Sequence, residues 1–388
     1  MEKYSRIKAQ IDLDAIAFNF EQMKRNLSEG TKMVAVIKAD GYGHGSRQIA
    51  HLVQDYDYIW GFATATVEEA VELRHGGVTK PILLLGYAFP EHYGIIAEYD
   101  LSPAVFKLDM AEQLSKAAQV AGKEITIHLA VDTGMTRIGV ADCKDSIPAI
   151  EKIGGLPGIK ITGAFTHFAR ADEESKEPAY VQMERFTAFL SLLEQHHIHI
   201  PLRHCSNSAG LIRMQEANMD MVRAGISIYG MYPSDEVETN MVTLRPAMSL
   251  ISHISYIKEV APGVSISYGG TYTTKRKTTV ATIPVGYADG YPRQLSNKGS
   301  VLIKGQRAPI LGRVCMDQFM VDITDLTDVH ELDAVTLLGQ DGEESITAEE
   351  LGSLSGRFHY ELVCNISKRV PRVYVQNGSI VEEQDYFS

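Results

Sequence analysis

The chain has 388 residues, and its 37 lysines and arginines against 49 aspartates and glutamates give a formal net charge of −12 at pH 7. With 45% apolar and 22% charged residues, its composition is that of a folded globular protein and excludes a disordered chain. No run approaches the ~18 consecutive apolar residues of a membrane span. The acidic balance argues against a nucleic-acid partner, because lysine and arginine supply most of that affinity.

The first residues, MEKYSRIKAQIDLD, mix charges with short apolar runs and lack the apolar core of a secretion signal. The four cysteines, Cys143, Cys205, Cys315 and Cys364, lie far apart and form no C-x-x-C pair. We therefore expect reduced thiols and a cytoplasmic protein. At roughly 100–200 residues per domain, the length predicts two domains, or one barrel with an added module.

After a helix-like segment at 12–27, short β-branched runs alternate with amphipathic stretches, which is typical of a parallel sheet with crossover helices. Eight such units within about 220 residues favour a closed (β/α)₈ barrel over an open sheet. The predicted strands are residues 33–38, 58–63, 82–85, 102–106, 125–131, 159–166, 202–205 and 221–223.

The pattern changes near residue 234. From about residue 244 helical periodicity nearly disappears and turn signals such as Pro262-Gly263, Lys304-Gly305 and Asn377-Gly378 recur between β-branched runs. The fold class is therefore α/β, with a TIM-type (β/α)₈ barrel over residues 1–240 and a second, mostly β domain over residues 241–388.

Reactive side chains collect at the predicted carboxyl ends of the barrel strands, where such barrels carry their active sites. Lys38 ends the first strand, and a partly desolvated lysine suits covalent or base chemistry. His167 ends the sixth strand. The other strand ends contribute Asp132 and Arg137, then Asn207 and Ser208, then Arg223, Gly225 and Ile226.

These segments resemble the bacterial alanine racemases, which pair an N-terminal barrel with a C-terminal β domain and use pyridoxal 5′-phosphate (PLP). The resemblance covers almost the whole chain, in the family's order. It rests on AVIKADGYGHG, VDTGMTRIG, FTHFARADE, HCSNSAG, MVRAGISIYG, SYGGTY, PVGYADGYPR, GRVCMDQFMVD and HYELVCNISKRVPRVY.

The resemblance implies two catalytic bases, because racemisation needs one base on each face of the substrate Cα. Lys38 corresponds to the lysine that binds PLP covalently and serves one face. Tyr268, in SYGGTY, corresponds to the second base, which reaches in from the other subunit of a homodimer. The implied reaction interconverts L- and D-alanine and supplies D-alanine for peptidoglycan.

The resemblance also implies the cofactor's surroundings. Arg223 would face the pyridine nitrogen, and because arginine cannot accept a proton, that nitrogen would stay unprotonated. His167 would support Arg223 by a hydrogen bond. The other implied cofactor contacts, including the phosphate site, are Tyr42, Arg137, Asn207, Ser208, Gly225, Ile226 and Tyr360.

For the amino-acid substrate, the resemblance implies that Arg137 and the backbone N–H of Met316 bind the carboxylate and that Tyr287 lines the entrance. Met316 and Tyr287 would come from the partner subunit. Ala130 departs from the family, many of whose members carry a carbamylated lysine at this position. The resemblance allows an anion such as chloride there, and the loss leaves open a racemase of broader scope, such as one acting on serine.

Two further PLP-binding functions are alternatives for a chain of this pattern. A barrel-type PLP decarboxylase would be expected to place an acidic residue against the pyridine nitrogen, where this chain has Arg223. A non-catalytic PLP-binding protein would lack the β domain that carries Tyr268 and Met316. No metal is expected, because the histidine-rich stretch His196, His197, His199 and His204 is not followed by zinc-type ligand spacing.

Overall fold

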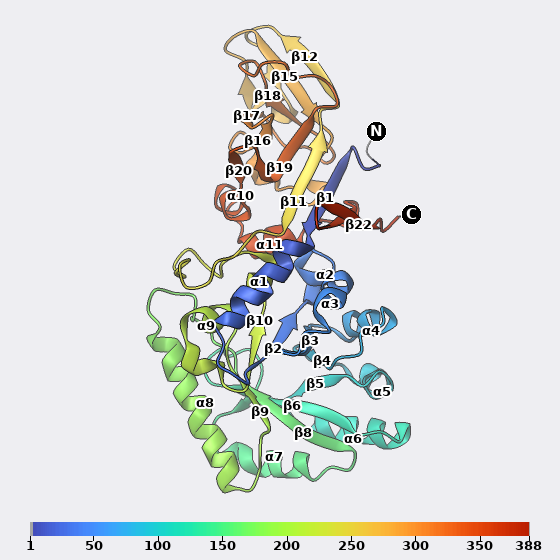
Figure 1. Cartoon of the computed structure of the whole chain (residues 1–388), viewed down its shortest axis with the longest axis vertical. Helices are drawn as coiled ribbons and strands as arrows, with labels where there is room; N and C mark the ends of the chain where they lie inside the picture. The colour runs from blue at the N-terminus through green and yellow to red at the C-terminus, as the bar shows by residue number, and fades with distance from the viewer. Residues whose placement is uncertain (1–2, 388) are drawn as a thin grey trace. The chain divides into compact units, whose positions relative to one another are not determined.

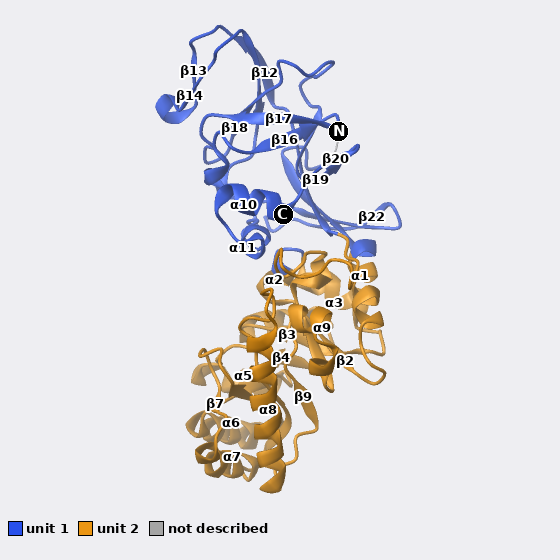
Figure 2. Ribbon diagram, turned by 90° about the vertical axis from the view of Figure 1, so that its left-hand side faces the viewer, with its two compact units in different colours: residues 1–15, 42–44, 246–388 blue, residues 16–41, 45–245 orange. Residues whose placement is uncertain are grey.

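The computed structural model describes residues 3–387, which form two compact units (Figures 1 and 2). One unit comprises residues 16–41 and 45–245 and contains the barrel. The other comprises residues 1–15, 42–44 and 246–388 and contains most of the remaining strands. No helix of residues 3–387 has both the length and the apolar character that crossing a membrane requires.

The barrel unit contains eight parallel strands in the hydrogen-bonded order β10-β2-β3-β4-β5-β6-β8-β9, with the short strand β7 (Val140–Ala141) beside β6. The ring nearly closes, because the backbone of Asp220 donates to Arg203 O (3.2 Å) and that of Arg223 donates to Ser206 O (3.0 Å) between β9 and β10. The strands are β2 Lys32–Val36, β3 Ile59–Thr64, β4 Ile82–Leu84, β5 Ser102–Val105, β6 Ile125–Asp132, β8 Ile159–Phe165, β9 Leu202–His204 and β10 Met221–Ala224. The predicted (β/α)₈ barrel with a second, mostly β domain is therefore confirmed.

Amphipathic helices connect the strands and bury one face each, as their periodicity predicts. Helix α4 begins with a capping box in which the Thr66 side chain and the Glu69 side chain each accept a backbone N–H of the other residue. Helix α6 ends at Gly122 in the left-handed conformation. The helices are α3 Ser46–Val53, α4 Val67–His75, α5 Tyr93–Glu98, α6 Leu108–Ala121, α7 Ile147–Gly154, α8 Glu177–Gln195 and α9 Ser208–Arg213.

The β unit is built on one sheet in which β1, from residues 7–12, is an interior strand. β1 pairs antiparallel with β11 and parallel with β21, so the start of the described chain belongs to this unit and not to the barrel. The sheet strands are β1 Ile7–Asp12, β11 Met248–His253, β12 Tyr256–Val260, β15 Thr278–Ile283, β16 Ser300–Ile303, β17 Gln306–Leu311, β18 Phe319–Asp322, β19 Ala334–Asp341, β20 Glu344–Ile346, β21 Arg372–Gln376 and β22 Ser379–Gln384.

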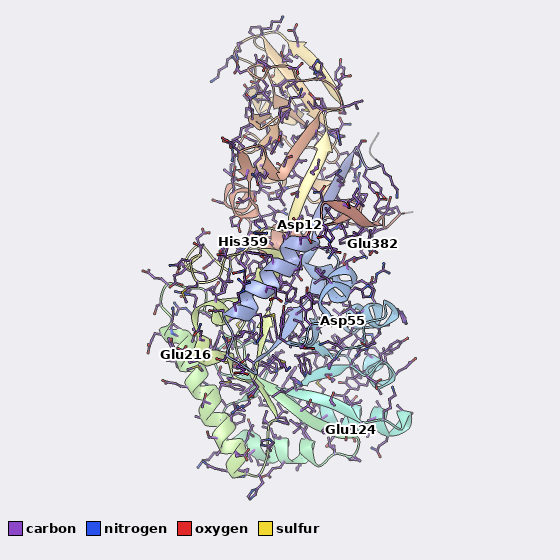
Figure 3. The ribbon with its side chains drawn as sticks, in the orientation of Figure 1. Asp12, Asp55, Glu124, Glu216, His359 and Glu382 are labelled. Carbon is purple, nitrogen blue, oxygen red and sulfur yellow. The ribbon has the colours of Figure 1, made fainter. Side chains whose placement is uncertain are left out.

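Two smaller features complete the β unit, and helix α1 (Leu13–Arg25) follows its first strand. A two-stranded sheet joins β13 (Ser265–Ile266) to β14 (Tyr272–Thr273). Two helices, α10 (Ala348–Ser355) and α11 (His359–Cys364), follow β20. After β1, the Asp12 carboxylate accepts the N–H of Ala15 (2.9 Å) and caps α1 (Leu13–Arg25; Asp12 is labelled in Figure 3).

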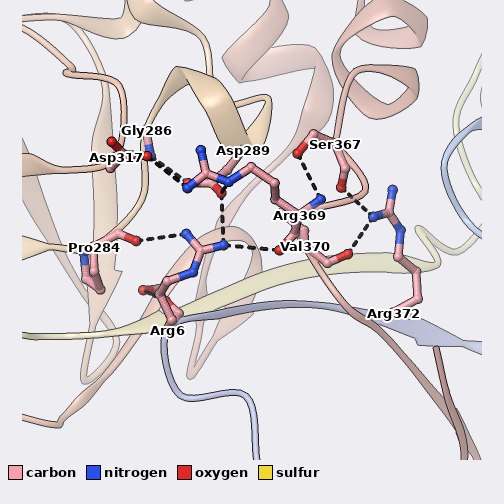
Figure 4. A network of polar contacts seen from close by, with 10 residues as sticks. Arg6, Pro284, Gly286, Asp289, Asp317, Ser367, Arg369, Val370 and Arg372 are labelled. Atoms are coloured by element: carbon pink, nitrogen blue, oxygen red, sulfur yellow. Dashed lines mark hydrogen bonds and ion pairs between the residues drawn. The ribbon is translucent and has the colours of Figure 1, made fainter. Parts of the chain in front are cut away.

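Arg372 is a buried cation in the β unit, and its partners are backbone carbonyls. Its guanidinium donates to the carbonyl oxygens of Gly43 (3.1 Å), Ser367 (2.7 Å), Val370 (2.6 Å) and Ile366 (2.7 Å), and Figure 4 shows part of this set. One side chain thereby joins β21 to the segment 366–370 and to residues 42–44.

We predict that Arg372→Leu lowers the free energy of unfolding by about 3 kcal/mol or more, because it removes the buried guanidinium that donates to four backbone carbonyls. Chemical denaturation measures the change. Arg307→Leu is the matched control, since Arg307 pairs with Glu344 and Glu350 at the surface and its loss should cost less than about 1 kcal/mol. Equal effects of the two substitutions would contradict the structural role of Arg372.

Candidate active site

A cavity lies at the carboxyl ends of the barrel strands and gathers residues from six of them or from the segments that follow them. Lys38 comes from the segment after β2, Arg137 from the loop after β6, His167 from the end of β8 and Arg223 from β10. Its lining includes three of the predicted cations and no aspartate or glutamate. The cavity therefore suits an anionic ligand.

Lys38 begins a turn of unusual handedness. The sequence predicts a strand that includes Lys38. In the structure β2 ends at Val36, and Lys38 starts the short helix α2 (Lys38–Tyr42). Ala39, Asp40 and Tyr42 all have φ near +50°, in the left-handed region that costs an L-residue roughly 1–2 kcal/mol. The Asp40 carboxylate accepts the N–H of Ser46 (3.0 Å), which ties the turn to the first residue of α3.

Arg223 lies in β10 with 3% of its surface exposed. Nη1 donates to Nδ1 (2.8 Å) and the carbonyl oxygen (3.1 Å) of His204, and Nη2 donates to the carbonyls of Thr166 (2.7 Å) and Cys205 (3.0 Å). Desolvation lowers the pKa of Arg223 to about 10, so the guanidinium stays charged at neutral pH. Among the described residues, no hydrogen bond from its Nε–H is present.

His167 is the second ring that contacts this arginine. Its Nδ1 lies 3.2 Å from Arg223 Nη2, and its carbonyl accepts the amide of Gln182 (3.1 Å). Burial, with Arg223, Arg137 and Lys38 nearby, holds the pKa of His167 well below its usual range. His167 is therefore neutral, and its contact with Arg223, implied by the resemblance, is present in the structure.

Ser208 joins the loops that follow β9 and β10. Its hydroxyl oxygen accepts the N–H of Gly225 (3.0 Å) and of Ser227 (3.4 Å), while Asn207 caps α9 by accepting the N–H of Gly210 (3.0 Å). Ile226 starts a 3₁₀ turn, Ile226–Tyr229, directly after Gly225. The hydroxyl of Ser227 is buried and has no hydrogen-bond partner within residues 3–387.

Ala130 lies on the wall of the cavity, buried with Ala104 and Phe165 and packed by Leu85 and Phe106. This wall is apolar, in contrast to the cationic side that carries Arg137 and Arg223. The methyl group of Ala130 offers no carboxylate, so a group that orients Arg137 does not come from this position.

The remaining predicted site residues lie in the β unit. A hollow there is lined by Ser267, Tyr268, Gly269, Cys315, Met316, Asp317, Gln318 and Met320. Tyr268 is 72% exposed, Met316 52% and Tyr287 42%, which is high for large apolar side chains. Tyr42 and Tyr360 also belong to this unit, where their rings lie 6.1 Å apart; burial raises the pKa of Tyr42 well above its usual range.

A buried carboxylate organises the loops that present Tyr287 and Met316. The Asp289 carboxylate pairs with Arg6 (2.9 Å) and Arg369 (3.7 Å) and accepts the N–H of Gly286 (3.0 Å). Arg369 also pairs with Asp317 (2.8 Å), next to Met316 (Figure 4). The two loops are joined directly, because the Tyr287 N–H donates to Cys315 O (3.1 Å) and the Ala288 N–H to Met316 O (3.0 Å).

Sequence reasoning missed two residues of the barrel site. His204 contacts Arg223 directly, and His128 contacts His204, with 2.9 Å between His128 Nδ1 and His204 Nε2. In the sequence His204 belongs to the same histidine-rich stretch as the exposed His196, His197 and His199, but it ends a barrel strand, and that position is the available signal. His128 lies inside β6 and carried no signal beyond being a polar residue in an apolar strand.

Comparison with known proteins identifies the family. Residues 11–233 match the family described as alanine racemase, N-terminal domain, and residues 247–374 match the family described as alanine racemase, C-terminal domain. The chain is 42% identical over 378 residues to alanine racemase 1 of Clostridium acetobutylicum, which covers 97% of each protein. This chain belongs to the alanine racemase family.

Solved alanine racemases also share its structure. The enzyme of Clostridium difficile 630 is similar with a TM-score of 0.96 and 41% identity over 100% of both chains. That of Bacillus anthracis, solved with bound L-Ala-P, is similar with a TM-score of 0.93 and 35% identity over 100% of this chain and 99% of the other. The members of the family are isomerases, and the barrel and the β unit together span the family's fold.

The buried histidines near Arg223 predict a specific dependence of stability on pH. Desolvation lowers the pKa of His128 to about 3, so the folded chain keeps this ring neutral while the unfolded chain protonates it below pH 6.5. Stability is therefore present above pH 6.5 and is lost as the pH falls. His128→Asn should reduce the slope of unfolding free energy between pH 6 and 4.5 by about 1.4 kcal/mol per pH unit.

Denaturant titrations at several pH values measure that slope. The exposed His197, which has φ +60°, is the control position, because asparagine tolerates this backbone conformation. His197→Asn should leave the slope unchanged. A slope unaltered by His128→Asn would show that the ring is protonated in the folded barrel.

Proposed function

We propose that this protein is a PLP-dependent alanine racemase that interconverts L- and D-alanine by a two-base mechanism. The observation that carries the proposal is the barrel cavity, in which the amine of Lys38 shares a lining with Arg223, a group that donates hydrogen bonds and cannot accept a proton. The names of the relatives, which are alanine racemases, support alanine as the substrate.

The residues present fit PLP. Its phosphate and phenolate are anionic, and the cavity carries three cations without a carboxylate. Ser208 and Gly225 are hydrogen-bonded to each other, and Ser227 adds a buried hydroxyl that has no partner in the described part of the chain. We assign the phosphate to Tyr42, Ser208, Gly225, Ile226 and Tyr360, with Asn207 holding the start of α9.

When bound, PLP supplies an aldehyde for the Lys38 amine and a conjugated ring that accepts the electron pair left at Cα. Arg223 would donate its remaining Nε–H to the pyridine nitrogen of bound PLP and, being charged at neutral pH, would not give up that proton. Arg223 would thereby leave the nitrogen unprotonated and the ring a weak electron sink, which would favour return of the proton to Cα over transamination. His167 holds Nη2 of Arg223 in place.

Two groups move the proton at Cα. The Lys38 amine takes or returns it on one face, and the Tyr268 hydroxyl does so on the other. Arg137 and the backbone N–H of Met316 hold the substrate carboxylate, and Tyr287 lines the entrance. Because Ala130 cannot carry a carbamate, Arg137 is oriented by another group or by a bound anion such as chloride.

We propose that the enzyme is a homodimer in which the β unit of each subunit completes the partner's barrel site. The exposure of Tyr268, Met316 and Tyr287 supports this arrangement, because a dimer would cover these apolar side chains. We propose a cytoplasmic role in supplying D-alanine for peptidoglycan, and the four free cysteines suit that reducing compartment.

The activity is tested by incubating the purified protein with PLP and L-alanine and measuring D-alanine by chiral chromatography. Borohydride reduction should fix the cofactor to Lys38, which peptide mass spectrometry detects. We expect kcat/KM for alanine to exceed that for serine. An equal or higher value for serine would replace the proposed substrate.

Tyr268→Phe separates the two bases. Racemisation should fall by at least ~100-fold in both directions, because general acid–base catalysis on one face is lost. One enantiomer should still exchange its α-hydrogen with solvent through Lys38, which deuterium incorporation reveals. Full racemisation by this variant would exclude the two-base mechanism.

Shared sites predict complementation between inactive chains. Lys38→Ala and Tyr268→Phe chains, co-expressed with different tags and purified as heterodimers, should show about half of the wild-type activity per dimer, since one site is intact. Heterodimers of Lys38→Ala with Arg223→Ala should stay inactive, because both defects lie in barrels. Activity in neither pair would place Tyr268 outside its partner's site.

A further inference from the structure

Arg223 fixes the proton positions of the histidines around it. A guanidinium has only N–H donors, so a ring nitrogen that bonds to it must be an unprotonated acceptor. Nδ1 of His204 lies 2.8 Å from Nη1 of Arg223. His204 is fully buried and its pKa is held well below its usual range, so the ring is neutral with its single proton on Nε2.

The same reasoning extends one ring further. His204 Nε2 lies 2.9 Å from His128 Nδ1. Because Nε2 of His204 carries the proton, it donates, and Nδ1 of His128 accepts. His128 is also fully buried and neutral, so its proton lies on Nε2, which has no hydrogen-bond partner among residues 3–387. The arginine thus sets a directed chain from Arg223 to His204 to His128.

The barrel interior is shaped to hold these rings. The ring of Phe165 stacks on His204, with centroids 5.2 Å apart and planes 21° from parallel. Gly163 leaves room for His128, because a Cβ at this position would lie 2.7 Å from two atoms of the imidazole. Trp60 covers His128 from another side, with ring centroids 5.5 Å apart.

We propose that His128 is a positioning residue for racemisation. It acts through His204 to hold Arg223 in an orientation in which only the Nε–H is available to the cofactor. Both hydrogens of Nη1 are committed to His204, and those of Nη2 to Thr166, Cys205 and His167. The His204 tautomer is held from both sides, by the N–H of Arg223 at Nδ1 and by the His128 acceptor at Nε2. Without the acceptor at His128, the Nε2–H of His204 is left unsatisfied, and only Arg223 opposes transfer of the proton to Nδ1. A proton moved to Nδ1 would face the N–H of Arg223, and the two donors would repel.

Two substitutions at one position separate hydrogen bonding from packing. In His128→Asn, the amide oxygen stands close to the place of Nδ1 and can accept from His204. His128→Leu fills similar space but leaves the His204 Nε2–H unsatisfied. Circular dichroism and thermal melting establish that both variants fold before they are compared.

The first readout is the tautomer of His204, from long-range ¹H–¹⁵N correlations of ¹⁵N-histidine-labelled protein, assigned with a His204→Gln sample. The wild type and His128→Asn should carry the proton on Nε2, and His128→Leu should show a second tautomer. A proton on Nδ1 of His204 in the wild type would overturn the proposal, and this readout needs no activity.

The kinetic readout rests on the proposed function. For His128→Leu, kcat for alanine should fall about tenfold with KM within about twofold, while His128→Asn stays within about twofold of the wild type in both. Equal impairment of both variants, or of neither, would overturn the positioning role. Absence of racemase activity in the wild type would remove the proposed function, and the tautomer measurement would still decide the hydrogen-bonded chain.

Discussion

The barrel site depends on one buried cation. Among residues 3–387, Arg223 has no carboxylate partner and is instead held by three backbone carbonyls and two imidazoles. Burying an unpaired charge is costly unless its donors are satisfied. Three features satisfy the donors of Arg223. These are the neutral histidines, the carbonyl groups at the ends of β8 and β9, and the near closure of the ring beside β10. Among residues 3–387, the cavity lining offers no carboxylate that could neutralise this positive charge.

The β unit meets a related requirement with opposite charge. Asp289 is a buried carboxylate between two arginines, and its bonds join the loops that carry Tyr287 and Met316. These loops expose large apolar side chains to solvent. Exposed loops that nothing holds in place would adopt many conformations. Because a buried ion pair already holds the backbone of these loops, less conformational entropy would be lost when the loops become ordered against a partner.

The barrel and the β domain could be predicted from the sequence. So could the position of Lys38, His167, Ser208 and Arg223 at or just after the carboxyl ends of barrel strands, because strand ends are local features that a regular βα pattern reveals. The sequence could not reveal that β1 joins the β unit, since residues 7–12 look like any half-buried strand and their partners in β11 and β21 lie far along the chain. It could not reveal His128 either. A histidine inside a buried strand is interpretable only once its neighbour across the sheet is known, and here the neighbour is two strands away.

The position of β1 also has a consequence for biosynthesis. A ribosome makes residues 7–12 first, then the barrel, and only afterwards β11 and β21. All strands of the barrel are made before β11, so the barrel can fold as a unit, as domains do during synthesis. During this time both edges of β1 are unpaired. Pairing over so long a sequence separation is slow. The nascent chain therefore carries β1, whose Ile7, Ala9 and Ile11 are buried in the folded chain, with one edge unpaired until β11 is made and the other until β21 is made.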